Sequence, residues 1–481
     1  MAGIRIRLRR ESAALAPSQA GETPGEFTLG AFIWPAVIAI VLLALVARAY
    51  NVDWDEGSHL HPDERHLSIV AAGVKLPSSL LEYFDSNSSP LNPYNRDGGS
   101  FVYGTLPLFL TKVVANALGK DDYDHLYLAG RWLSALFSAG AVLLVFLIGR
   151  RLYGSAAGLI GAVLMASAPL AIQQAHFFVV DPFLTLFTTA LLFYSVRIVQ
   201  DGRRSDYALA GLMLGLAMAC KVTAIVIAPV LLVAVAARLW PSIRERLSGH
   251  QLTTKQMEDA GQALISLALA VFVAFVAFRV AQPYAFDTPN LTNLGLALNS
   301  HWLSDQSQQR ELLGGDAAFP PSVQWIARSS YVYPLSEMVR WGMGPAFAIA
   351  GWAAFGFAAF RLIRRGDARH LLPVLFVLLY FGFMGRQFSL YLRYFLPLYP
   401  VLALLAGYAL VELVRGAATL AQRCGRPQLG RAGYGAVAVV LALSLLAGLA
   451  YVSIYTRTST RIEASRWIYE NLPAGSTLAS E

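Results

Sequence analysis

A stretch rich in histidine and acid, SHLHPDERH at residues 58–66, directly follows the first strongly apolar run of the chain. It contains two adjacent carboxylates, Asp63 and Glu64. Near a membrane face, a carboxylate costs desolvation energy unless it is paired or functional. Adjacent residues on a helix point about 100° apart, so the side chain of one can face a cavity while the side chain of the other holds the first residue in position. We therefore expect Asp63 to be a general base and Glu64 its orienting partner in catalysis; the alternative is a solvated surface helix.

The same stretch also offers ligands for a metal ion. His59, His61, Asp63 and His66 are close in sequence, and Asp63 and His66 are spaced to share one helical face. The HxxxH spacing of a helical zinc pair is absent, and no cysteine lies near. A metal bound through His61, Glu64 or His66 stays open as an alternative. A divalent cation such as Mg²⁺ or Mn²⁺ is optional, and no cofactor is expected to be obligatory.

A second carboxylate, Asp181, stands in HFFVVDPFLTLF at the expected external start of an apolar segment. It could simply complement the helix dipole, but its expected position on the same side as Asp63 favours a catalytic role. Lys221 is the only charged residue in the apolar region 207–237. It either extends to the interface or, if it faces the bundle interior, binds an anion.

Arginines also occur at the external ends of predicted spans, against the usual distribution of positive charge. Arg131 opens YLAGRWLSALFS, and Arg393 stands beside Tyr394 in RYFLPLYP. With Lys221, these residues could bind an anionic group at the outer interface, such as a lipid phosphate. Each arginine alone could instead reach out to lipid headgroups.

The composition indicates which kind of protein holds these residues in place. The chain of 481 residues is 56% hydrophobic and 14% charged, which is typical of a multi-pass membrane protein. Its net charge of +8 comes from short basic clusters between apolar segments, a pattern of membrane topology rather than of nucleic-acid binding. The region 207–239 could be a hairpin that turns at Lys221. We predict an all-α membrane protein of about eleven spans, near 29–50, 130–149, 155–175, 180–199, 207–220, 222–239, 262–281, 341–362, 370–385, 395–414 and 433–455.

The basic clusters fall on alternate connections, which places the amino terminus in the cytoplasm and the carboxyl terminus outside. Two long external loops, 51–129 and 282–336, result, and the first should hold amphipathic helices at the interface. Such loops on one face of a bundle usually build a site. Residues 1–28 are expected to be a cytoplasmic tail and 29–456 the membrane module. Residues 457–481 are expected to be the truncated start of an external domain.

These motifs, in this order and on this side, resemble the GT-C glycosyltransferases. The resemblance rests on four features: HPDE after the first span, RWLSALFS, an aspartate at a later external span end, and RYFLPLYP. The resemblance extends over nearly the whole chain and is nearest to the protein O-mannosyltransferases and the bacterial aminoarabinose transferases, the family 39 type. It implies the GT-C fold and a location in the plasma membrane or the inner membrane of a bacterium.

The resemblance also implies a reaction. A hexose or pentose would pass from a polyprenyl-phosphate carrier to a lipid, glycan or protein acceptor on the external face, with inversion at the sugar. Asp63 would be the catalytic carboxylate of the first loop, Asp181 the acidic residue of the second, and Arg131 the arginine after the first loop. Where the aminoarabinose type has a lysine before Pro-Pro-Leu, this chain reads GTLPL, so Lys221 or Arg393 would bind the phosphate instead.

A transporter or flippase of a lipid-linked or anionic substrate is the main alternative. Such proteins usually show paired repeats and charges in the middle of the membrane, and the sequence shows neither clearly. A non-catalytic scaffold for an envelope assembly is a third reading. The acidic residues on one external face favour the enzyme.

Overall fold

The structure is a computed structural model that describes residues 26–96, 99–290, 294–316 and 320–479. The predicted tail 1–28 therefore lies outside the described residues, except for 26–28. Within the described residues the chain is helical, and its only β pairing is an isolated bridge between Phe286 and Leu298. The predicted all-α class is confirmed.

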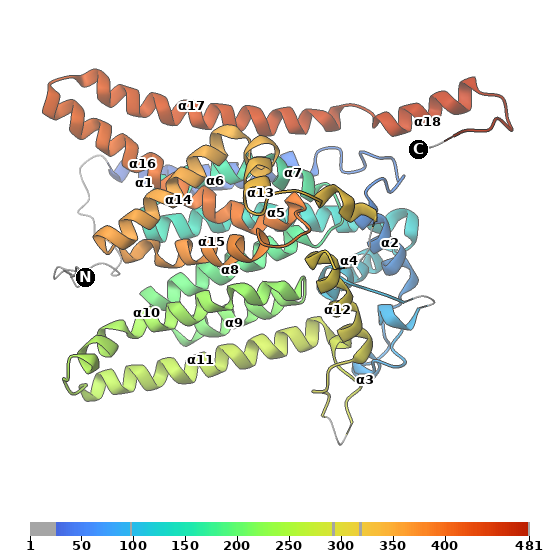
Figure 1. The fold of residues 1–481 in the computed structure, drawn as a ribbon, viewed down its shortest axis with the longest axis horizontal. Coiled ribbons are helices and arrows are strands. Elements are labelled where there is room, and N and C mark those ends of the chain that lie inside the picture. The colour runs from blue at the N-terminus through green and yellow to red at the C-terminus, as the bar shows by residue number, and fades with distance from the viewer. Residues whose placement is uncertain (1–25, 97–98, 291–293, 317–319, 480–481) are drawn as a thin grey trace.

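Long helices run side by side and form the body of the molecule (Figure 1). They are α1 (Glu26–Ala49), α5 (Tyr123–Tyr153), α8 (Asp181–Gln200), α10 (Ala228–Leu247), α11 (Thr254–Ala281), α14 (Pro345–Arg365), α16 (Tyr399–Cys424) and α17 (Pro427–Val452). Shorter helices complete the body: α6 (Ser155–Ala166), α7 (Pro169–Ala175), α9 (Arg204–Met218) and α15 (Leu371–Met384).

Each of the eleven predicted segments contains a helix, but the number of spans is not confirmed as eleven. Among the described residues, eight helices are long and apolar enough to cross a membrane, or nine if α6 and α7, bent by 59°, form one span. The helices α9 and α15 have 15 and 14 residues. At 1.5 Å per residue they span only about 20 Å, less than the ~30 Å hydrocarbon core. The predicted turn at Lys221 is present, because α9 ends at Met218 and a 3₁₀ turn from Val222 leads into α10.

Burial follows the arrangement of the body. The helices α8 and α16 are mostly buried, whereas α1, α11 and α17 expose many aliphatic side chains. Outward-facing apolar residues are expected where the surrounding solvent is lipid. Small residues allow close approach inside: a Cβ atom on Gly407 of α16 would lie 2.2 Å from the carbonyl oxygen of Ala157 on α6.

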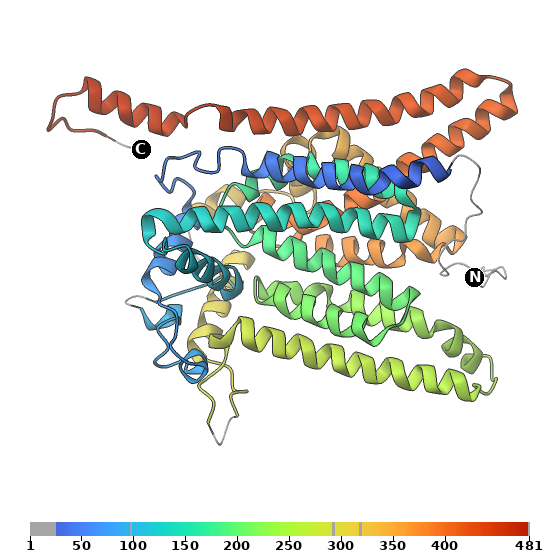
Figure 2. The same ribbon diagram turned by 180° about the vertical axis from the view of Figure 1, so that it is seen from behind.

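The first long loop contains α2 (Pro62–Gly73), α3 (Leu80–Phe84) and α4 (Thr105–Ala117), and the second contains α12 (Ser300–Gly314) and α13 (Val332–Glu337). The first loop and the α12 part of the second lie at one end of the body (Figures 1 and 2), whereas α13 lies over the middle of the body in Figure 1. At the carboxyl end, α18 (Thr460–Asn471) has no buried residue. Its assignment to a further domain stays a prediction.

Candidate active site

A buried ionic cluster fixes the start of α2 against α5. Arg131 donates from Nε to Glu64 at 2.9 Å and from one terminal nitrogen to Glu64 at 2.5 Å and to Asp55 at 2.8 Å. The backbone N–H of Phe178 donates to the same Glu64 carboxylate at 2.7 Å. All three ionic side chains are fully buried. This bidentate pairing joins the first loop, α5 and the segment that leads into α8.

The cluster engages both Glu64 and Arg131 in contacts within the protein. Neither side chain lines the cavities at this end of the protein. The sequence predicts that Arg131 binds phosphate. In the structure its N–H groups donate to Glu64 and Asp55, and one terminal nitrogen donates to the carbonyl oxygen of Val52 at 2.8 Å. A buried guanidinium needs such compensation, and little is left to offer a ligand. Asp55 was not singled out from the sequence, since nothing local distinguishes it from other loop acids.

Asp63 lies on the other side of the same helical turn. Its carboxylate forms an ion pair with Arg393 at 2.9 Å, and both side chains are partly exposed, at 17% and 19%. Arg393 comes from the 3₁₀ turn Leu392–Leu398 that precedes α16. Asp63, Arg393, Tyr103 and Tyr394 line one cavity, together with Ser322 and Ser389 among others. The carboxylate can therefore meet a ligand there.

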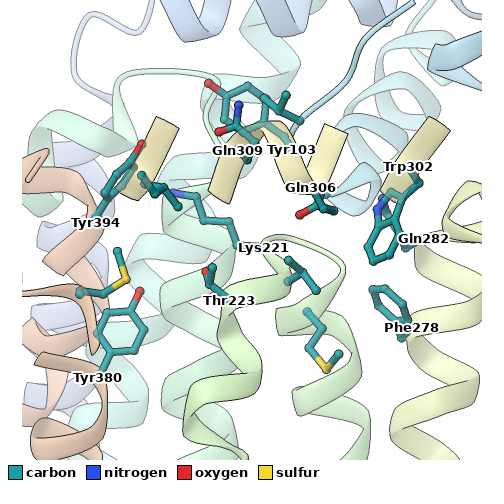
Figure 3. A pocket seen from close by; sticks show the side chains of 16 residues that line it. Tyr103, Lys221, Thr223, Phe278, Gln282, Trp302, Gln306, Gln309, Tyr380 and Tyr394 are labelled. Carbon is teal, nitrogen blue, oxygen red and sulfur yellow. The ribbon is translucent and has the colours of Figure 1, made fainter. Parts of the chain in front are cut away.

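The second predicted carboxylate is paired as well. Asp181, in the first turn of α8, accepts a hydrogen bond from Lys221 at 2.8 Å, and Asp181 is almost fully buried while Lys221 is 20% exposed. The Lys221 ammonium also lies over the ring of Tyr394, 4.4 Å from its centre. Lys221 lines a second cavity, shown in Figure 3.

The two cavities adjoin. They share the lining residues Val102, Tyr103, Gln309, Leu313 and Tyr394. The structure thus brings five of the predicted residues to one place: Asp63, Asp181, Lys221, Arg393 and Tyr394. Two carboxylates and two cations beside adjoining cavities can bind an anion and accept a proton.

The segment GTLPL, residues 104–108, joins the first loop to the residues that follow α9. The N–H groups of Gly104 and Leu106 donate to the carbonyl oxygens of Cys220 and Ala219, at 3.0 and 3.2 Å. A Cβ atom on Gly104 would lie 2.0 Å from the Ala219 oxygen, so this approach requires glycine. Thr105 is buried and donates its hydroxyl to Ala281 at 2.7 Å. The segment therefore places Tyr103 opposite Lys221 and offers no phosphate ligand from Thr105.

The histidines of the first loop do not converge on one point. His61 stacks on Phe177, His66 lies near Phe101, and His59 stacks on Tyr123. Glu64 is occupied by Arg131. In the described part of the chain no group of three or more histidine, cysteine, aspartate or glutamate side chains could hold a metal ion. The alternative metal ligands named from the sequence therefore do not converge on one ion among the described residues.

His61 caps the helix that carries Asp63. Its Nδ1 accepts a hydrogen bond at 3.3 Å from the N–H of Glu64, in the N-cap position of α2. Nδ1 must be unprotonated to do so, and a positive charge at a helix start is unfavourable. Burial lowers the pKa of His61 below its ordinary value, although Asp63 opposes this effect. The helix start thus favours neutral histidine.

We expect the unfolding temperature to fall as the pH drops below about 6.5, the pKa of an unfolded histidine. The sign follows because the unfolded chain binds this proton more readily than the folded one. Burial also lowers the pKa values of His59 and His66, so all three contribute. His61→Asn keeps a capping oxygen but cannot titrate, and should flatten the dependence measured by thermal unfolding between about pH 8 and 5. An equally steep profile in this variant would contradict the role of His61.

One face of α12 lines a cavity and is not among the predicted site residues. Trp302, Gln306, Gln309 and Leu313 line the cavity of Figure 3, and their spacing of four, three and four residues places them on one helical face. This periodicity was a readable signal in the segment HWLSDQSQQRELL. The polar composition of residues 282–336 predicts an external loop there and does not by itself indicate this helical face.

Comparisons with known proteins define the class of this fold. The sequence profile of the family described as dolichyl-phosphate-mannose-protein mannosyltransferase matches residues 123–254. Solved structures of similar shape include the Archaeoglobus fulgidus oligosaccharyltransferase and ArnT from Cupriavidus metallidurans, and the all-helical fold that this chain shares with them is the predicted GT-C fold. A comparison with curated protein sequences gives no match.

Two of the similar structures contain a lipid phosphate. The oligosaccharyltransferase AglB from Archaeoglobus fulgidus, with an inhibitory peptide and a dolichol-phosphate, has a TM-score of 0.54 and 14% identity, covering 93% of this chain and 59% of its own. ArnT from Cupriavidus metallidurans, bound to undecaprenyl phosphate, has a TM-score of 0.53 and 16% identity, covering 93% and 82%. The chain therefore spans about three fifths of the archaeal enzyme's length. That enzyme was also solved with Zn and sulfate.

Proposed function

We propose that this protein is a membrane glycosyltransferase that takes a sugar from a polyprenyl-phosphate carrier. One observation carries the proposal: Asp63 and Arg393 face one cavity, while Lys221, paired with Asp181, faces the adjoining one. A general base and two phosphate-binding cations are the groups that the reaction needs. The two similar structures were solved with dolichol-phosphate and with undecaprenyl phosphate.

An apolar groove beside the site suits the carrier's hydrocarbon chain. It lies between α4, α9 and α11, and side chains such as Phe109, Leu216, Phe272 and Val276 line it. Its residues Val280 and Ala281 directly precede Gln282, which lines the cavity of Figure 3. A phosphate near Lys221 could therefore continue into a lipid tail that leaves between α4 and α11.

From these ion pairs we propose a sequence of events. A donor phosphate would attract Arg393 away from Asp63, and Lys221 would bind the same phosphate while it remains beside Asp181, so that the two cations neutralise the phosphate charge. Asp63 would then accept the proton of an acceptor hydroxyl or amine as that group attacks the anomeric carbon. The bond between this carbon and the phosphate oxygen breaks, polyprenyl phosphate leaves, and the configuration inverts. Asp181 would hold Lys221 in place for the departing phosphate.

The charge distribution supports an external site. Several helices carry arginines in their last turn, at the end of the body away from the cavities: α5 (Arg150, Arg151), α10 (Arg244, Arg246) and α14 (Arg364, Arg365). Cytoplasmic membrane ends are enriched in such residues. The opposite end, with α2 and α12, would then face outward. We place the protein in a plasma membrane or a bacterial inner membrane, with its acceptor on the outer side.

A transporter explains the site less well. The bend between α6 and α7 is a feature that transporters use for binding, with exposed backbone groups at the break. Here the fully buried Arg48 donates to the carbonyl oxygens of Met165 and Ala166, at 3.0 and 2.9 Å. The protein itself satisfies these groups.

The removal of the Lys221 charge tests the phosphate role. We expect Lys221→Gln to weaken binding of undecaprenyl phosphate by about 10- to 100-fold, because a charged hydrogen bond contributes ~1.5–3 kcal/mol. Because this change leaves the buried Asp181 carboxylate without its cation, the double variant with Asp181→Asn and Lys221→Gln should be measured as well. Lys120→Gln, an exposed change in the first loop, serves as the control. Native mass spectrometry in lipid nanodiscs reports the affinity, and unchanged binding in both variants would contradict the assignment.

The proposed function as a whole is tested by purification and transfer. Mass spectrometry of lipids that copurify with the protein should detect a polyprenyl-phosphate species. Incubation with a labelled polyprenyl-phosphate sugar and native membranes should move label into an acceptor fraction. If the carrier binds but crosses the bilayer in proteoliposomes without sugar transfer, the protein is a flippase.

A further inference from the structure

The cavity of Figure 3 has the chemistry of a carbohydrate site. Phe278 and Trp302 supply aromatic surface, and neutral polar side chains surround it: Tyr103, Thr223, Gln282, Gln306, Gln309, Tyr380 and Tyr394. Among the described residues that line it, Lys221 alone is charged, and Asp181 pairs with that charge. A site built from amides, hydroxyls and aromatic rings suits a polar but uncharged ligand.

The amides of α12 are available to such a ligand. Within the described residues, no hydrogen bond engages the side chain of Gln306 or of Gln309, and both are half-buried. Figure 3 shows them projecting from the same helix into the cavity. Each amide offers a donor and an acceptor, as a sugar hydroxyl does.

Other polar groups of the lining have restricted roles. Gln282 accepts a hydrogen bond from the backbone N–H of Thr105 through its Oε1, at 2.5 Å. This leaves its Nε2 as a donor for the cavity. Burial raises the pKa of Tyr103 well above its ordinary value, so its phenol stays protonated and neutral. These groups add hydrogen-bonding capacity without adding charge.

We propose that this cavity binds the sugar of the donor, that the sugar is uncharged, and that Gln306 and Gln309 determine this specificity. The inference rests on the proposed function and extends it to the class of substrate. A cationic amino sugar would find no unpaired carboxylate in the lining and would carry its charge into a partly buried site. Burial of an unpaired charge is costly, so such a donor is discriminated against.

The experiment compares three donors in nanodiscs: undecaprenyl phosphate carrying a neutral hexose, the same carrier with an amino pentose, and the carrier alone. Dissociation constants are measured by native mass spectrometry, which needs no acceptor. We expect the neutral donor to bind at least ten times more tightly than the amino-sugar donor. Gln306→Glu and, separately, Gln309→Glu should reduce or reverse this preference, because each supplies a carboxylate for an ammonium group.

Gln308→Glu is the matched control. It lies on the same helix, makes the same change of charge and is exposed to solvent. The preference for the neutral donor should survive this change. Equal or tighter binding of the amino-sugar donor by the unaltered protein overturns the inference, and so does an equal response to all three substitutions. Failure to bind even the carrier alone overturns the proposed function as well.

Discussion

Asp63→Asn is expected to lower the rate of sugar transfer by about 10²- to 10⁴-fold, the usual contribution of a general base. The amide keeps the size of the side chain but cannot accept the acceptor's proton. It also releases Arg393 from its ion pair at 2.9 Å. Donor affinity should therefore stay equal or increase while the chemical step slows. Single-turnover transfer from a labelled polyprenyl-phosphate sugar, together with donor binding, separates the two effects.

A control at the same end of the protein tests whether this effect is specific. Asp124→Asn changes an exposed carboxylate in the first turn of α5 and should leave transfer intact. A normal rate in Asp63→Asn would remove this residue from catalysis. A loss of donor binding without a change in the chemical step would instead make it a binding residue.

The adjacent change, Glu64→Ala, should act on stability. The removal of this carboxylate leaves Arg131 buried with only Asp55 as an ionic partner and deprives the Phe178 N–H of its acceptor. The loss of one partner from a buried ion pair typically costs about 3–5 kcal/mol. We expect a marked fall in the unfolding temperature in detergent, and a reduced yield of folded protein, measured by thermal unfolding and gel filtration.

Two further variants determine whether the buried charge is the cause. Glu64→Ala combined with Arg131→Met removes the unpaired cation and should recover part of the lost stability, a coupling typical of residues in contact. Glu56→Gln alters an exposed glutamate of the same loop and should change little. If the double variant is no more stable than Glu64→Ala, loss of charge pairing is not the reason.

Some features could be predicted from local patterns. The long apolar segments predicted an all-helical membrane protein, and helices occupy every predicted segment. The position of SHLHPDERH predicted that its acids lie at one end of the bundle. The angle between neighbours on a helix predicted that Asp63 and Glu64 face different surroundings, and they do: one lines a cavity and the other is buried. These properties depend on a few consecutive residues.

The role of Arg131 could not be predicted from its neighbours in the sequence. An arginine at an external span end can bind a phosphate, reach a headgroup or join a buried cluster, and the adjacent residues do not distinguish these cases. Its partner Glu64 lies 67 positions away. The choice depends on how α2 and α5 pack, which the sequence pattern alone does not reveal.

The sequence by itself determined the membrane class, the succession of helices and the acidic first loop, because hydropathy and helical period are properties of short windows. Only the tertiary structure decided which charges meet. It paired Asp63 with Arg393 and Asp181 with Lys221, and it turned one face of α12 toward Lys221. Ion pairs between distant segments form only where packing brings them within a few ångströms and removes water, and that is decided by the whole bundle.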